Sequence, residues 1–211
     1  AVAHNTRSGN AFPIRRAMAD FGDGTFGVRL NGRFYRVDNQ LVRNSNGVWA
    51  SAGAGAENSM WVSIAEKAIA LHDAVDPGSP YLRLQSTSPS VIFDGFGSES
   101  FASPLIRGEF ASSAADLGNK LFAKWNSYQN VVITLTPPVS TVNGVHAYTL
   151  WNVNRNAAGT VTSLQLRNPY GNADGSANGY SDSNANDAMV TLTPAQVFAD
   201  NGGRVSWGTA G

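Results

Sequence analysis

The sequence predicts an α+β fold, because helix-like periodicity gathers in its first half and strand-like alternation dominates its second half. Its 211 residues can form one large domain or two small lobes around a buried core. We expect a single domain with two approximate lobes, a helix-containing lobe over residues 1–100 and a β-rich lobe over residues 101–211. The Gly-, Pro- and Ser-rich segment 76–101 is expected to connect them.

The first half carries two helix signals and one hairpin signal. Pro13 suits the first position of a helix that continues to about Phe21. The dipeptide Asn31-Gly32 separates two alternating runs, which predicts a β-hairpin over residues 25–37. A further helix is expected from residue 58 or 59 to about residue 72, where apolar side chains at helical spacing form a stripe that faces the core.

The second half carries one long helix, several strands and a short helix near its end. Leucine and tryptophan recur every four residues within a helix expected over residues 113–125. An apolar run that stops at Pro137-Pro138 predicts a buried strand. The expected strands cover residues 131–136, 145–153, 160–167 and the surroundings of Val205, and Thr193-Pro194 opens the short helix.

Composition limits the classes of function. Charged residues make up 14% of the chain and the formal net charge is zero, which argues against partners such as nucleic acid or an anionic membrane. No apolar run approaches the roughly 18 residues of a transmembrane helix. The chain has no cysteine and hence no disulfide or thiolate metal site. Its Asn-, Ser-, Thr- and Gly-rich surface chemistry favours an exported or extracellular location over the cytoplasm.

One histidine and one asparagine form the candidate site. If the loop between the strands at 145–153 and 160–167 is centred near Ala157, antiparallel pairing puts His146 opposite Asn168, with Cβ atoms roughly 4.5–5.5 Å apart. An amide oxygen at that distance can orient an imidazole, and a base held by a third group is the general arrangement of nucleophilic catalysis. A lone histidine in an apolar strand is more often a core residue, but Asn168 in register, together with the motifs around it, favours chemistry.

The motifs around this pair resemble a known family. The segments 144–148, with His-Ala-Tyr, and 166–171, with Arg-Asn-Pro-Tyr-Gly, resemble the C-terminal catalytic motifs of calpain-type cysteine peptidases, a branch of the papain fold. Tyr170 stands where that family usually has Trp. Residues 21–38 and the Met-Trp-Val-Ser-Ile-Ala-Glu-Lys-Ala segment at 60–68 are similar to blocks of bacterial calpain-like domains, so the resemblance covers nearly the whole chain from about residue 11.

The resemblance implies a Cys-His-Asn peptidase with a protein or peptide substrate and a role for each matching residue. His146 would accept the thiol proton and later protonate the leaving amine. Asn168 would fix the tautomer of the imidazole. Pro169 would keep the backbone after Asn168 extended. Tyr170 would either shield the His–Asn hydrogen bond from water or simply pack.

The nucleophile that the resemblance requires is not in the sequence. Residues 1–3 resemble the middle of the helix that carries the catalytic Cys, so we expect the Cys and the oxyanion Gln to precede Ala1, on a lost or separate N-terminal segment. The chain is then predicted to be inactive by itself. The alternative is a catalytically dead pseudopeptidase that binds or scaffolds proteins.

No cofactor is expected. The loop over residues 172–187 offers oxygen ligands for calcium, but its spacing does not match an EF-hand, and we interpret it as a surface loop. The histidines lack the spacing of a zinc site. His72 is expected to stabilise the C-terminal end of a helix, and His4 has no assigned partner.

Overall fold

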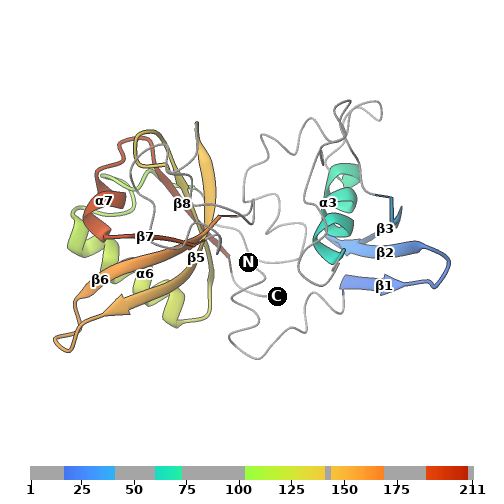
Figure 1. Ribbon diagram of the computed structural model, residues 1–211, viewed down its shortest axis with the longest axis horizontal. Helices are drawn as coiled ribbons and strands as arrows, with labels where there is room; N and C mark the ends of the chain where they lie inside the picture. Colours follow the sequence, from blue (N-terminus) through green and yellow to red (C-terminus); the bar gives the residue numbers. More distant parts are fainter. Residues whose placement is uncertain (1–16, 41–59, 73–102, 141–143, 169–188, 209–211) are drawn as a thin grey trace. The chain divides into compact units, whose positions relative to one another are not determined.

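The computed structural model describes residues 17–40, 60–72, 103–140, 144–168 and 189–208. These residues fall into an N-terminal and a C-terminal unit, with the boundary between Glu99 and Ser100. Each unit has its own antiparallel sheet and its own hydrophobic core (Figure 1). Both units combine strands with helices, which confirms the predicted α+β class.

The N-terminal unit contains a three-stranded sheet in the order β1-β2-β3 and one helix, α3. Asn31 and Gly32 link β2 to β3 with φ angles of 46° and 75°, as a tight hairpin turn requires. The predicted hairpin is therefore confirmed. The elements are β1 (Met18–Asp20), β2 (Thr25–Leu30), β3 (Arg33–Asp38) and α3 (Trp61–His72).

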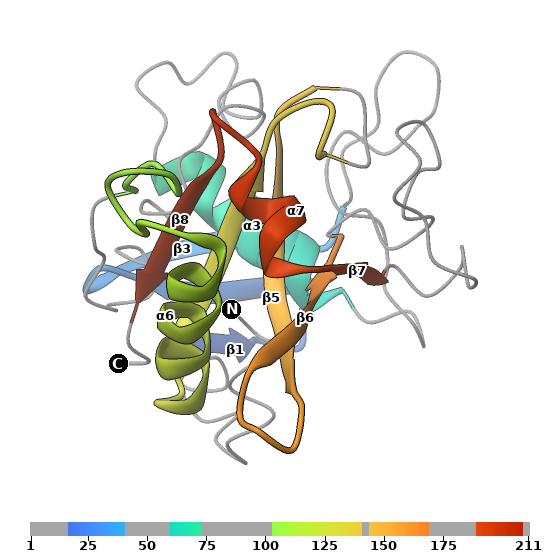
Figure 2. The same cartoon turned by 90° about the vertical axis from the view of Figure 1, so that its left-hand side faces the viewer.

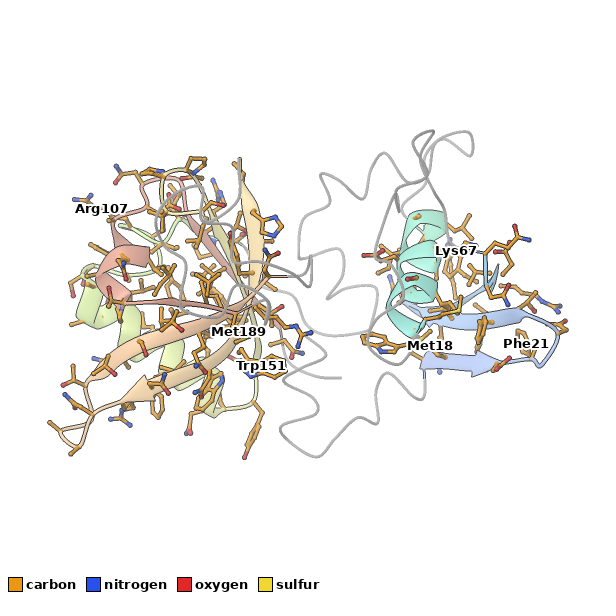
Figure 3. The ribbon with its side chains drawn as sticks, viewed as in Figure 1. Met18, Phe21, Lys67, Arg107, Trp151 and Met189 are labelled. Carbon is orange, nitrogen blue, oxygen red and sulfur yellow. The ribbon has the colours of Figure 1, made fainter. Side chains whose placement is uncertain are left out.

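The core of this unit lies between α3 and one face of the sheet. Val28 and Leu30 of β2 are fully buried and share the core with Ile64 and Ala68 of α3, as the expected helical stripe predicts. Met18 of β1 packs against the same cluster (Figure 3). The helix thus covers the apolar face that alternation creates on β2.

The prediction of a helix that continues to about Phe21 is wrong for its last residues. Residues 18–20 form β1 and pair with residues 26–28 of β2. The backbone N–H of Phe21 donates to the carbonyl of Thr25 at 3.1 Å, which places Phe21 in the turn between the strands. Pairing between distant backbone segments overrides the local helix signal here. The N-terminal lobe is consequently not purely helical among its described residues.

The C-terminal unit is a five-stranded antiparallel sheet in the order β7-β6-β5-β4-β8, with two helices on one face (Figure 2). Helix α6 packs against the three central strands and α7 against β6. The elements are α6 (Ala114–Asn126), β4 (Asn130–Leu135), β5 (His146–Arg155), β6 (Val161–Arg167), β7 (Met189–Leu192), α7 (Pro194–Phe198) and β8 (Arg204–Gly208).

Both helices of this unit begin where the sequence predicts. The hydroxyl of Ser113 accepts a hydrogen bond from the N–H of Asp116 at 3.1 Å and caps α6. Thr193 and Gln196 form a reciprocal capping box at the start of α7. The leucines at positions 117 and 121 of α6 are fully buried against the sheet, which confirms the predicted apolar stripe.

The hairpin of β5 and β6 contains two register shifts of opposite sense. On β5 the pairing passes from Leu150 to Asn152 and leaves Trp151 as an extra residue. On β6 it passes from Val161 to Ser163 and leaves Thr162 as the extra residue. The two bulges cancel, so the register at the open end of the hairpin equals the register at its turn. The strands were predicted, but the bulges were not.

Some expectations lie outside the described residues. These are the connecting segment 76–101, the loop over 172–187 and the side chains of His4, Pro169 and Tyr170. Among the residues that the structure describes, no helix is long and apolar enough to cross a bilayer.

Candidate active site

The candidate site lies where two neighbouring strands of the C-terminal sheet meet. His146 is the first residue of β5, and Asn168 directly follows the last residue of β6. Alternation places His146 on the same side of β5 as Tyr148, and Asn168 on the same side of β6 as Leu166. Both Tyr148 and Leu166 are fully buried members of the core. The two polar side chains therefore belong to the face of the sheet that the helices cover.

The side chains of His146 and Asn168 form a hydrogen bond. Nε2 of the imidazole lies 3.0 Å from Oδ1 of the amide. An amide oxygen can only accept, so Nε2 carries the hydrogen and the basic lone pair is on Nδ1. Asn168 is 1% exposed, and a hydrogen bond of low exposure to water is stronger than one at the surface. The arrangement fixes both the tautomer and the orientation of the ring.

The contact forms in a register different from the expected one. Thr149 pairs with Arg167, so the ladder continues towards Tyr148 opposite Asn168, two residues away from His146. Because two residues is one full period of a strand, the pair still shares a face. Diagonal neighbours at this spacing remain within reach of long side chains. The expected hydrogen bond is present, whereas the expected direct opposition is wrong.

The register differs because the turn comes one residue later than predicted. Asn154 was expected in the turn, but it lies in β5, and its Nδ2 donates to Oγ of Ser163 across the hairpin at 2.9 Å. Asn156 forms the turn instead: its carbonyl accepts from the N–H of Gly159 and its Oδ1 from the N–H of Thr160, each at 2.9 Å. The loop is therefore centred on residue 158 rather than on residue 157.

Burial changes the protonation of the site. Desolvation lowers the pKa of His146 below its ordinary value of 6.5, and the hydrogen bond to Asn168 opposes part of this shift by favouring the charged ring. The imidazole is thus mainly neutral at pH 7. A neutral imidazole with its lone pair on Nδ1 can accept a proton, which is what a general base must do.

Two further side chains belong to the surroundings of His146. The ring of Tyr148 meets the imidazole edge-on, with centroids 4.9 Å apart and planes at 81°. Its hydroxyl lies 3.3 Å from Oγ of Ser140. The sequence did show that positions 146 and 148 share a face of a strand. It contains no signal for Ser140, which precedes the strand in a turn.

His72 belongs to the N-terminal unit. It is the last residue of α3, and its Nδ1 lies 2.7 Å from the hydroxyl of Tyr35. The two rings also meet edge-on at 5.5 Å. This hydrogen bond joins the end of the helix to β3, so the side chain has a structural contact within its own unit.

The described residues contain no group of three side chains that could hold a metal ion. The loop that offers calcium ligands lies outside them. The site residues that the structure describes, an imidazole and an amide, suit proton transfer and its orientation.

No family model and no curated protein matches the chain.

Proposed function

We propose that His146 and Asn168 are the base and its orienting residue in a calpain-like cysteine peptidase with a papain-type core. The observation that carries this proposal is the 3.0 Å hydrogen bond between Nε2 of His146 and the nearly inaccessible amide of Asn168. It leaves the lone pair on Nδ1, where a thiol proton can be taken up. The order of the His-Ala-Tyr and Arg-Asn-Pro motifs along the chain adds support.

In the proposed reaction, Nδ1 of His146 takes the proton of a cysteine thiol, and the thiolate sulfur attacks the carbonyl carbon of a peptide bond. The imidazolium then gives its proton to the leaving amine, and an acyl thioester remains on the cysteine. Water hydrolyses the thioester with His146 again as the base, which restores the thiol. Asn168 accepts from Nε2 throughout, so the ring keeps one orientation in both protonation states.

The nucleophile of this proposal lies outside the 211-residue sequence, which contains no cysteine. A thiolate beside His146 would raise the pKa of the imidazole, because an opposite charge favours the protonated ring. Burial, which lowers the pKa, therefore suits the state before proton transfer, when the base must be neutral. We expect the 211-residue chain alone not to hydrolyse peptides.

The experiment uses the whole gene product that contains this chain. It is treated with a peptide that carries a thiol-reactive electrophile, and the modified residue is identified by mass spectrometry. We expect one cysteine N-terminal to Ala1 to be labelled, and His146→Ala to abolish rapid labelling. Asn154→Ala is the matched control for Asn168→Ala, because both remove an amide from the same hairpin. Only the change at Asn168 is expected to slow labelling.

A pseudopeptidase that binds proteins is the second candidate, favoured by the absence of cysteine from the sequence. A folded gene product in which no cysteine is labelled faster than a free thiol would establish this alternative and overturn the peptidase. Equal labelling of the parent and of His146→Ala would also overturn the peptidase, because the thiol would then react without a base.

A further inference from the structure

Tyr148 contacts the imidazole of His146 in addition to Asn168. Asn168 holds the ring through Nε2, whereas the Tyr148 ring meets it edge-on with 4.9 Å between centroids. Tyr148 is 0% exposed, so it has little freedom to move within the packed core. Rotation of the imidazole would have to break a hydrogen bond and displace a buried ring.

Tyr148 is itself tethered through its hydroxyl. The oxygen lies 3.3 Å from Oγ of Ser140, a side chain that is also 0% exposed. Ser140 ends a tight turn after β4, in which the N–H groups of Val139 and Ser140 both donate to the carbonyl of Thr136 at 2.9 Å. The position of the tyrosine ring therefore depends on the position of this turn.

A buried carboxylate holds the first residue of this turn, Thr136. Asp200 follows α7 and is 3% exposed. Its Oδ2 accepts from the N–H of Thr136 at 2.6 Å, and its Oδ1 accepts from the hydroxyl of Thr136 and from the N–H of Gly202 at 2.9 Å. An ionised carboxylate only accepts, so it suits three donors that converge on it.

We infer that Tyr148 is a positioning residue for His146, and that Asp200 and Ser140 act on the site through it. The line of contacts runs from Asp200 through Thr136 and Ser140 to Tyr148 and ends on the imidazole. This inference rests on the proposed role of His146 as the base. It adds residues that neither the His–Asn pair nor the motifs assign to the reaction.

A purely structural Tyr148 makes a different prediction. If the ring only fills the core, its loss lowers the stability of the fold, but in the folded chain His146 keeps its hydrogen bond to Asn168 and therefore its tautomer. If the ring positions His146, its loss admits water to the imidazole. Since burial is what lowers the pKa of His146, that pKa then rises towards its ordinary value of 6.5.

The test is an NMR titration of His146 in the 211-residue chain, with ¹⁵N shifts of the imidazole reporting the tautomer. Tyr148→Leu should raise the pKa of His146 and lower the fraction that carries hydrogen on Nε2. Tyr148→Phe and Ser140→Ala remove opposite ends of one hydrogen bond. We expect each to shift the titration in the same direction by a smaller amount, and the double variant to shift it by less than the sum of the two single shifts.

Two additional variants complete the design. Asp200→Asn keeps the size of the side chain but turns one acceptor into a donor that faces the donors of Thr136 or Gly202, and we expect the same direction of shift. Leu192→Ala is the control, because Leu192 is 1% exposed in β7 and its loss destabilises the same core. It should leave the titration of His146 unchanged.

Unchanged titration and tautomer in Tyr148→Phe, Ser140→Ala and folded Tyr148→Leu would overturn the inference. An equal shift in Leu192→Ala would also overturn it, because general loosening of the core would then explain the effect. These measurements need no peptidase activity. If the tyrosine variants shift the titration but no cysteine of the gene product is labelled, the positioning role stands and the proposed function is overturned.

Discussion

The hairpins β2–β3 and β5–β6 each bury one face, but they fix their register by different means. β2 and β3 pair without interruption and turn at Asn31-Gly32, where both residues have positive φ. β5 and β6 turn through residues 156–160 and contain two bulges. The turn chemistry decides the pairing of the first hairpin. The second hairpin depends on contacts with the rest of its unit.

The bulge on β5 shows this dependence. Tyr148 and Leu150 are buried at a spacing of two, but the next buried residue is Val153, so alternation skips one position at Trp151. The carbonyl of Trp151 accepts a hydrogen bond from Nε1 of Trp125 in α6 at 3.1 Å. The helix thus holds the extra residue in place. A bulged strand can accommodate a change of length that an unbulged strand cannot.

The largest expected effect comes from deletion of Arg29, an exposed residue of β2. The loss of one residue from a strand without a bulge moves Val28 to the opposite face relative to Leu30. Both side chains are 0% exposed. Moving one of them to the solvent-facing side, together with the residues that follow the shift, lowers the free energy of unfolding by about 3–5 kcal/mol. This loss is measured by urea unfolding of the N-terminal unit, which is monitored through the NMR signals of α3.

Deletion of Trp151 is the matched change in the other hairpin. It removes the extra residue, restores regular alternation and leaves Leu150 opposite Leu166. It costs the hydrogen bond from Trp125 and the contact of Arg167 with the indole ring, about 1–2 kcal/mol together. The hydrogen bond between His146 and Asn168 should persist. Equal losses from the two deletions would contradict the difference between the hairpins.

Gly32→Ala tests whether turn chemistry controls the first hairpin. Gly32 has a φ of 75°, and a Cβ added to it would have no atom within 4 Å, so the expected cost of about 1–2 kcal/mol comes from the backbone alone. Asn31→Gly is the control and should change the stability by less than about 0.5 kcal/mol. Thermal unfolding of both variants gives the comparison. A cost below that of the control would show that contacts other than the turn fix the register.

The same contrast explains what the sequence could predict. The hairpin at Asn31-Gly32, the caps of α6 and α7 and the meeting of His146 with Asn168 follow from local signals and strand parity. Strand β1 does not, because its pairing with β2 competes with a local helix signal. The hydrogen bonds between Asp200 and Thr136 join residues 64 positions apart, and no short-range pattern records them. The catalytic role of the His–Asn pair remains a prediction from resemblance and geometry.

Asn154→Ala is expected to have a smaller effect, at the turn end of the second hairpin. The side chain donates to Oγ of Ser163 and accepts from Nδ2 of Asn152, each at 2.9 Å in a half-buried position. Loss of the cross-strand bond costs about 1 kcal/mol. A double-mutant cycle with Ser163→Ala measures the pairwise part. Because the bulges and the core fix the register, the titration of His146 should not change, and a changed titration would contradict this.

The smallest expected effect is a pH dependence of the stability of the C-terminal unit, which His146 in the second hairpin should cause. Burial lowers the pKa of this residue in the folded chain below 6.5, so the unfolded chain binds a proton more readily. Stability is therefore highest above about pH 6.5 and falls as the pH drops towards the folded pKa, below which this contribution becomes constant. His146→Gln should remove this part of the pH dependence of urea unfolding.

Carboxylates with lowered pKa values, such as Asp116, lose their contribution only below the ordinary carboxyl pKa of 3.8, so the two pH ranges are separate. A parent chain whose stability is constant between pH 7 and pH 5 would contradict the lowered pKa of His146, because the folded and unfolded chains would then bind the same number of protons.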